Sequence, residues 1–132
     1  MLERALVAIV DDDESIRRAT HSLLRSAGFA TAAFSDAESF LASEARASTA
    51  CLVADMRMPG MSGLELHEAL LASGDGIPTV LITAYPEDIT RSRAREAGIS
   101  CLLGKPFAPE DLLECINEAL ARQRRGKPIP KS

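Results

Sequence analysis

At 132 residues with a formal net charge of −4, the chain is long enough for one compact domain and too short for two of ordinary size. Hydrophobic residues make up 46% of it and charged residues 26%, a balance that argues against intrinsic disorder. The apolar run at residues 5–10 ends on an acid and is too short for a signal peptide or for the roughly 20 residues of a membrane span. We therefore expect a cytoplasmic protein that does not contact a membrane.

The charge is unevenly distributed along the chain. Residues 122–132 carry five of the 15 basic residues and no acid, which leaves 10 basic against 19 acidic residues, a balance of −9, in residues 1–121. So acidic a body is a poor binder of nucleic acid. We expect a folded domain over residues 1–121 that does not bind DNA directly, followed by a basic tail or linker at 122–132.

Short apolar runs alternate with amphipathic stretches, which predicts βα units and a parallel sheet. The strands are predicted at residues 5–10, 30–34, 50–54, 78–83 and 99–103. Apolar residues at helical spacing predict helices at about residues 16–27, 36–41, 64–71, 86–97 and 109–120. The expected fold class is α/β, a doubly wound five-stranded parallel sheet of flavodoxin-like strand order 2-1-3-4-5 with five helices. The helix after Pro86 has few large apolar residues, so we expect it to be the most weakly anchored.

Three cysteines, Cys51, Cys101 and Cys115, lie far apart and fit no metal-binding spacing. Their odd number and the predicted location favour reduced, buried thiols that act as small apolar residues.

Acidic residues follow the first and third predicted strands. Asp11 and Asp12 follow the first strand, and Asp55 follows the third. These strands are neighbours in the expected sheet, so their carboxylates would meet at its carboxyl edge and repel one another unless they share protons or bind a cation. Mg²⁺ suits such a cluster, because it takes one or two carboxylates together with water and phosphate oxygens. Asp13 and Glu14 are better explained as caps of the following helix.

Thr83 ends the fourth strand and Lys105 follows the fifth, so a hydroxyl and an ammonium group would face the same edge. A carboxylate nucleophile, a divalent metal, a hydroxyl donor and a fixed cation together are what phosphoryl transfer requires.

Four segments carry a resemblance to a known family: Val10–Asp12, Asp55–Gly63, Ile82–Ala84 and Lys105–Phe107. Together they resemble the receiver domains of two-component response regulators, particularly the FixJ-like group, over about residues 5–121. The resemblance implies that Asp55 is the phosphoacceptor. It also implies that Asp12, Asp55 and the Arg57 carbonyl bind Mg²⁺ directly, while Asp11 acts largely through water.

The same resemblance assigns the remaining site residues. Thr83 would bond a phosphoryl oxygen, Lys105 would pair with the phosphate, and the small side chain of Ala84 would leave room for the phosphoryl group. The Lys105–Pro106 peptide bond is expected to be cis.

As a receiver domain the chain would be a phosphoacceptor protein with self-phosphorylation and self-dephosphorylation chemistry, and not a classical enzyme. Its donor would be a sensor histidine kinase or a phosphotransfer protein. Phosphorylation would alter the face formed by the fourth helix, fifth strand and fifth helix. A homodimer through that face, and a DNA-binding output domain if the chain is a fragment, are arrangements that the resemblance allows.

Two positions depart from the family pattern. Leu102 stands in the fifth strand where many receivers carry an aromatic switch residue, and Tyr85 lies where it could gate the site or replace that ring. The Arg57 side chain could tune hydrolysis at the entrance, although a solvated charge is the simpler interpretation.

Two alternative functions stay open. An aspartyl-phosphate hydrolase would need a second aspartate at position 57, which is Arg57. A pseudo-receiver would bind partners without phosphorylation, and Leu102 is compatible with it, whereas Asp12, Asp55, Thr83 and Lys105 are not expected of it.

Overall fold

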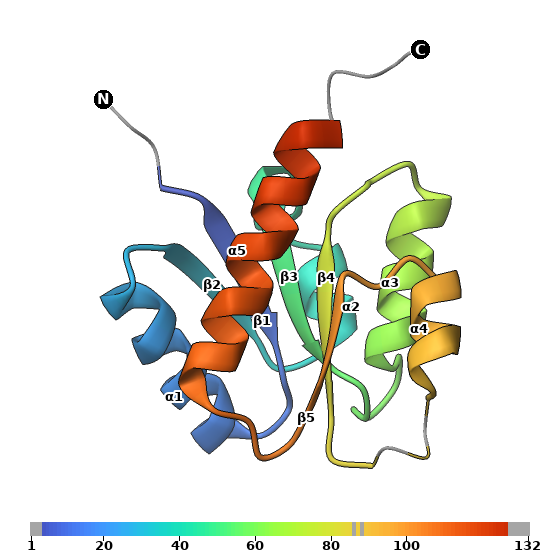
Figure 1. The fold of residues 1–132 in the computed structure, drawn as a ribbon, viewed down its shortest axis with the longest axis horizontal. Coiled ribbons are helices and arrows are strands. Elements are labelled where there is room, and N and C mark those ends of the chain that lie inside the picture. Colours follow the sequence, from blue (N-terminus) through green and yellow to red (C-terminus); the bar gives the residue numbers. More distant parts are fainter. Residues whose placement is uncertain (1–3, 86, 88, 127–132) are drawn as a thin grey trace.

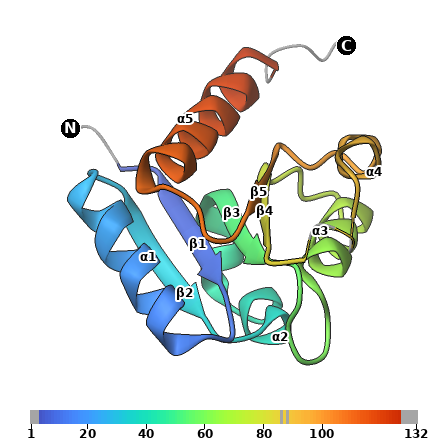
Figure 2. The same cartoon turned by 60° about the horizontal axis from the view of Figure 1, so that its bottom comes forward.

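The structure, a computed structural model, describes residues 4–85, 87 and 89–126 and shows a five-stranded parallel sheet covered by helices on both faces (Figures 1 and 2). The strand order is β2-β1-β3-β4-β5, which confirms the predicted 2-1-3-4-5 arrangement. The strands are β1 (Leu6–Val10), β2 (Ala30–Phe34), β3 (Thr49–Asp55), β4 (Thr79–Thr83) and β5 (Cys101–Gly104). The helices are α1 (Glu14–Ser26), α2 (Ala37–Leu41), α3 (Gly63–Ala72), α4 (Arg91–Glu96) and α5 (Pro109–Gly126), with a short 3₁₀ helix, η1 (Glu44–Ser48), before β3.

The central strands are buried on both faces, as expected for a sheet between two helical layers. Along β1, Val7 and Ile9 pack into one cluster with residues of α1 and α5, while Ala8 and Val10 pack into another with residues of α2 and α3. This alternation follows from the period of two along a strand. Figure 2 shows α1 and α5 on one side of the sheet and α2 and α3 on the other.

The helix termini are capped by residues from the preceding loops. Asp13 caps α1 by accepting from the Ile16 N–H at 3.1 Å, as the sequence predicted. Ser62 and Glu65 form a capping box at the start of α3, with both reciprocal hydrogen bonds present. No helix within the described parts of the chain is long and apolar enough to cross a membrane.

Two helices differ in length from the prediction. The fourth helix was expected from Pro86, but α4 begins at Arg91, because Thr90 caps it by accepting from the Arg93 N–H at 3.1 Å; Pro86 itself lies outside the described residues. The last helix continues to Gly126, so residues 122–126, predicted as part of a tail or linker, are helical. Arginine and glutamine favour helices and extend it as far as the glycine. Residues 127–132 of that predicted tail lie outside the described residues.

The expectation of three reduced cysteines is wrong for two of them. Cys101 of β5 and Cys115 of α5 form a disulfide with a Cα–Cα distance of 5.9 Å. The two are 14 residues apart in sequence and meet because α5 packs back against β5. Cys51 is a free thiol in the core, and burial raises its pKa to about 12.

Candidate functional site

Three acidic side chains meet at the carboxyl edge of the sheet. Asp11 follows β1 directly and Asp55 is the last residue of β3, which is the neighbouring strand. These two are 4% and 8% exposed, whereas Asp12 is exposed. One carboxylate oxygen from each of the three lies within 4.8 Å of the other two. The sheet therefore brings together the three acids that the sequence singled out.

Lys105 brings a positive charge to the same cluster. It follows β5, and its backbone N–H donates to the Thr83 carbonyl at 2.8 Å. Its Nζ lies 3.3 Å from Asp55 Oδ1 and 3.7 Å from Asp11 Oδ2. The Lys105–Pro106 peptide bond is cis, as expected. One ammonium group thus faces two buried carboxylates, with a third carboxylate beside them, so the cluster keeps a negative excess when all three acids are ionised.

The protonation equilibria reflect this excess. Burial raises the pKa of Asp55 from 3.8 to about 6, and the charge of Asp11 adds to the effect, while Lys105 opposes it. Burial also raises the pKa of Asp11, and the hydrogen bond that its carboxylate accepts from the Asp13 N–H opposes that rise. A divalent cation among the three acids would offset both the desolvation and the repulsion.

The end of β4 lines the same cavity. Thr83 is 4% exposed, and its Oγ1 donates to the Tyr85 carbonyl and accepts from the Tyr85 N–H, both at 3.0 Å. A cavity of about 300 Å³ lies beyond it. Its lining consists of Asp12, Asp13, Asp55, Arg57, Thr83, Ala84, Tyr85 and Lys105. The hydroxyl predicted to meet a phosphoryl oxygen is therefore next to the cavity but is bonded to its own turn.

Arg57 and Tyr85 form a contact at the rim of this cavity that the sequence did not predict. The Arg57 guanidinium carbon lies 3.8 Å from the centroid of the Tyr85 ring, within the range of a cation–π interaction. The two residues come from separate loops, after β3 and after β4. Tyr85 is 44% exposed, so the stacked pair lies where the cavity meets solvent.

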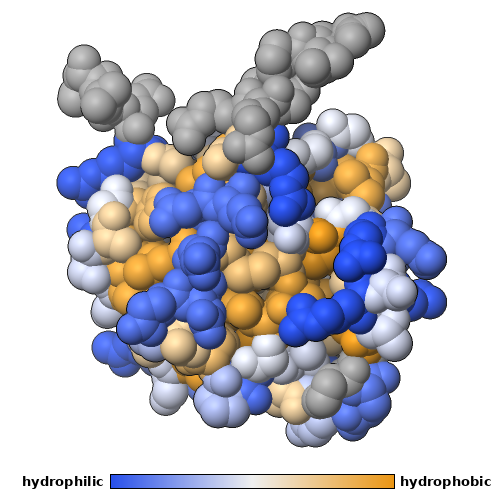
Figure 3. Space-filling view, viewed as in Figure 1, coloured by the Kyte–Doolittle hydropathy of each residue, from blue (hydrophilic) through white to orange (hydrophobic). Residues whose placement is uncertain are grey.

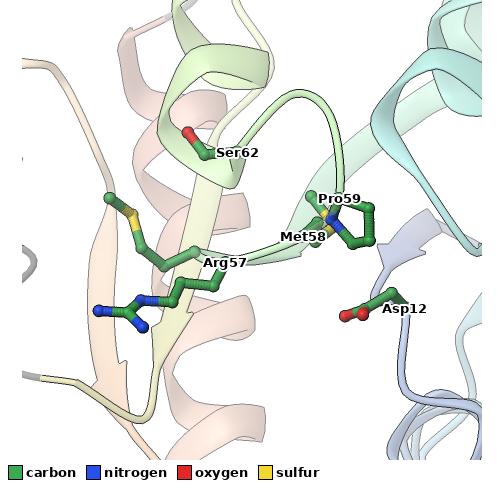
Figure 4. Close-up of a pocket in the computed structure, with 6 residues that line it drawn as sticks. Asp12, Arg57, Met58, Pro59 and Ser62 are labelled. Atoms are coloured by element: carbon green, nitrogen blue, oxygen red, sulfur yellow. The ribbon is translucent and has the colours of Figure 1, made fainter.

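The loop between Asp55 and α3 borders a second, larger cavity of about 570 Å³, whose lining includes Asp12, Arg57 and Ser62. Figure 4 shows the Arg57 side chain pointing away from Asp12 across this opening. The loop returns closely onto β3: the Gly63 N–H donates to the Met56 carbonyl at 3.1 Å. A Cβ at Gly63 would contact the Asp55 carbonyl and approach Leu81 Cδ1 to 2.7 Å, so this position admits only glycine without a shift.

Sequence reasoning missed one residue that supports the acidic loop. Arg17 of α1 donates through Nη1 to the Asp11 carbonyl at 2.8 Å, which ties the helix to the strand end. No sequence motif predicts this contact, because it depends on how α1 folds back over β1. His67 of α3 is buried away from this site, and its ring nitrogens lie 2.9 Å from Thr79 Oγ1 and 2.8 Å from the Ala97 carbonyl.

Leu102 lies away from the acidic cluster. It packs against the buried group that includes Leu64, Leu81 and Ile89, between the sheet and α4. Its carbonyl accepts from Arg91 Nη1 at 3.4 Å. The side chain thus occupies the space between β5 and α4, whereas Tyr85, in the turn after Thr83, is the aromatic residue that lines the cavity.

The family model that describes the response regulator receiver domain matches residues 7–117. Nodulation protein W of Bradyrhizobium diazoefficiens is 37% identical over 124 residues, 94% of this chain and 55% of the relative. Response regulator protein TodT of Pseudomonas putida is 38% identical over 129 residues, 96% of this chain and 57% of the relative.

Solved structures of response regulators are similar to this chain as well. The response regulator StyR superposes with a TM-score of 0.85 at 44% identity, covering 95% of this chain and 65% of StyR. The crystal structure of FixJ-N superposes with a TM-score of 0.80 at 34% identity, covering 91% of this chain and 96% of FixJ-N. The chain spans about half the length of the curated relatives it matches.

Proposed function

The chain belongs to the response regulator receiver domain family of two-component systems, and we propose that it accepts a phosphoryl group on Asp55 from a histidine kinase, with Mg²⁺ bound beside it. The observation that carries this proposal is the convergence of Asp11, Asp12, Asp55 and Lys105 from three strand ends into one cluster. A carboxylate nucleophile with a fixed ammonium group at 3.3 Å suits a reaction that attaches a negatively charged phosphoryl group to the nucleophile.

The acidic cluster fits Mg²⁺ by its chemistry, since it offers hard carboxylate oxygens from buried and exposed acids at a cavity open to water and phosphate. Asp12, Asp55 and the Arg57 carbonyl would hold the ion directly, and Asp11 through water. When bound, the ion would neutralise the charge shared between the acids and the phosphoryl oxygens.

The reaction follows from the positions of the protein's own groups. An Asp55 carboxylate oxygen attacks the phosphorus of a phosphohistidine, the N–P bond breaks, and the imidazole leaves with the bonding electron pair. Lys105 pairs with the transferred phosphoryl group, and the small Ala84 side chain leaves it room. Later a water attacks the phosphorus, the P–O bond to Asp55 breaks, and phosphate and the free carboxylate result. Because the protein consumes its own phosphorylated form, it acts as a phosphoacceptor and not as a classical enzyme.

The switch begins at Thr83. To bond a phosphoryl oxygen, its hydroxyl must stop donating to the Tyr85 carbonyl, which frees the turn that carries the Tyr85 ring. The α4 helix beyond that turn has six residues, of which Ala94 alone is buried, so a small shift of the turn is enough to move it. We infer that Tyr85, stacked on Arg57, gates the cavity, and that Leu102 follows α4 in place of an aromatic switch residue.

The α4–β5–α5 face carries charges that suit a homodimer. Arginines are exposed along α4, and acids are exposed along α5: Arg91, Arg93 and Arg95 on the first, Asp111, Glu114 and Glu118 on the second. A twofold contact would place each set opposite the other. The partners in this proposal are therefore a histidine kinase or phosphotransfer protein and a second copy. A cytoplasmic location follows from that donor.

The relatives suggest what the domain controls. The transcriptional regulatory protein FixJ of Bradyrhizobium diazoefficiens is one of the relatives that this chain covers only in part. We therefore place the receiver domain at residues 1–121 and propose that 122–132 connect to an output domain that binds DNA, since the acidic body is unsuited to do so itself.

Intact-mass measurement with acetyl phosphate and Mg²⁺ tests the proposal. We expect one phosphate per chain, none after Asp55→Asn, and normal uptake by Asp13→Asn, in which asparagine keeps the helix cap. Uptake by Asp55→Asn would contradict the assignment. A pseudo-receiver would take up none, and a hydrolase would turn over phosphate monoesters catalytically.

A further inference from the structure

The disulfide between Cys101 and Cys115 lies beneath the open edge of the sheet. β5 is the last strand and pairs only with β4, so the Cys101 end of the bond lies at a free edge. Cys115, on α5, is 7% exposed and belongs to the main hydrophobic cluster. Cys101 is partly exposed. Of the two bonded residues, Cys101 is therefore the one closer to solvent.

Cys101 lines a cavity of about 270 Å³ whose wall contains three arginines: Arg91 and Arg95 from α4 and Arg122 from α5. Figure 3 shows this side of the molecule, where an apolar strip between α5 and α4 is bordered by hydrophilic side chains of both helices. Arg91 is held at the strand edge, because its Nη1 donates to the Leu102 carbonyl at 3.4 Å. Cys101 thus borders a small pocket with a positively charged wall.

The three arginines differ from the acids and bases that the structure shows paired. None of them forms an ion pair with an acidic residue that the structure describes. Guanidinium groups bind carboxylates through paired N–H donors and are weakly hydrated, so such a pocket attracts an anion that carries carboxylates. A balance of −9 over residues 1–121 makes this positive patch an exception on the domain.

We propose that the Cys101–Cys115 bond is a thiol–disulfide exchange site for a low-molecular-weight thiol that bears carboxylates, of the glutathione class. The thiolate attacks the Cys101 sulfur, a mixed disulfide forms there, the bond to Cys115 breaks, and the Cys115 sulfur leaves as a thiolate that takes up a proton. A second thiolate then attacks the small-molecule sulfur of the mixed disulfide and releases the Cys101 thiolate. Two small thiols are oxidised to one disulfide while the protein pair is reduced by two electrons.

The exchange changes the connection between β5 and α5. With the bond closed, the edge strand and the helix are covalently tied; with it open, only packing holds α5 on β5. This site involves none of the residues proposed for phosphorylation, so it can be tested in protein carrying Asp55→Asn. Arg91 and Arg95 also belong to the face proposed for the homodimer, so both tests use protein dilute enough to be monomeric.

The first test asks which sulfur reacts. Protein carrying Cys115→Ser is incubated with glutathione disulfide and analysed by intact mass and peptide mapping. We expect a single glutathione adduct on Cys101, formed when the Cys101 thiolate attacks the reagent and releases one glutathione thiolate. Protein carrying Cys101→Ser should form no adduct while circular dichroism shows it folded, because Cys115 and Cys51 are buried. An equal adduct on Cys115, or none on Cys101, would overturn the proposal.

The second test asks whether the arginines select the thiol. Reduction of the wild-type disulfide is timed with glutathione and with cationic cysteamine, each normalised to its rate on a small model disulfide. Arg91→Gln combined with Arg95→Gln should slow reduction by glutathione roughly threefold to tenfold, the size expected for two exposed charge contacts, and leave cysteamine no slower. Arg93→Gln is the matched control, since Arg93 is exposed on the same helix but does not line the pocket. Normalised rates that are equal for both thiols, and unchanged in the double variant, would refute the selection.

Discussion

Replacing Asp55 by asparagine should make the metal-free protein more stable at neutral pH, although the same change should abolish phosphate uptake. Asp55 is 8% exposed, and burial together with the charge of Asp11 raises its pKa from 3.8 to about 6. The folded chain therefore binds this proton more tightly than the unfolded chain does. Between pH 3.8 and 6 the unfolded chain releases this proton while the folded chain still holds it, so the free energy of unfolding falls as pH rises. The full penalty is present above pH 6.

The size of the penalty follows from the two pKa values. At about 1.4 kcal/mol per pH unit, an ionised Asp55 lowers the free energy of unfolding by about 3 kcal/mol at about pH 7.5 and by about 1 kcal/mol at about pH 4.5. Asparagine removes the charge but weakens the contact with Lys105, which lies 3.3 Å away. We therefore expect Asp55→Asn to gain about 1 to 3 kcal/mol at neutral pH and clearly less in acid.

Urea denaturation in the presence of a chelator, at both pH values, measures this gain. Asp36→Asn is the control: Asp36 is a surface helix cap whose pKa is lowered by its hydrogen bonds to Ser39, so its replacement should not stabilise the protein. Added Mg²⁺ should stabilise the wild type more than Asp55→Asn, since the ion binds the folded state through that carboxylate. If Asp55→Asn were no more stable than the wild type at neutral pH, the inferred repulsion at the site would be wrong.

Three further predictions concern the loops and the disulfide. Gly63→Ala should cost about 1 to 3 kcal/mol, because its Cβ would lie 2.7 Å from Leu81 Cδ1; chemical denaturation measures this, and an unchanged midpoint would contradict the close approach. Tyr85→Ala should speed both acetyl phosphate uptake and loss of the phosphoryl group several-fold by removing the ring stacked on Arg57, as followed by intact mass; unchanged rates would leave the ring without a gating role. Reducing the β5–α5 disulfide, which spans 14 residues, should lower stability by up to about 3 kcal/mol, and calorimetry with and without reductant checks it; identical melting curves would exclude a stabilising bond.

Much of the fold could be predicted from the local pattern of apolar and polar residues. The apolar runs, their length and the helical spacing between them are properties of neighbouring residues, so the five strands and their order could be predicted before any contact was known. The acids directly after β1 and β3 were predicted to meet for the same reason, because the carboxyl ends of parallel neighbours must lie at one edge. Element boundaries were less certain: the cap at Thr90 started α4 later than Pro86 had suggested.

The sequence by itself thus determined the sheet, the identity of the acidic cluster and the family resemblance, since each rests on local periodicity or on a short motif. The tertiary structure alone decided which distant side chains touch: Arg17 on the Asp11 carbonyl, Arg57 over Tyr85, and Cys101 bonded to Cys115. Those contacts depend on how helices and loops fold back across the strand ends, and no pattern of nearby residues specifies that geometry. The pairing of Cys101 and Cys115 shows the difference most clearly, because spacing and number alone had suggested three separate thiols.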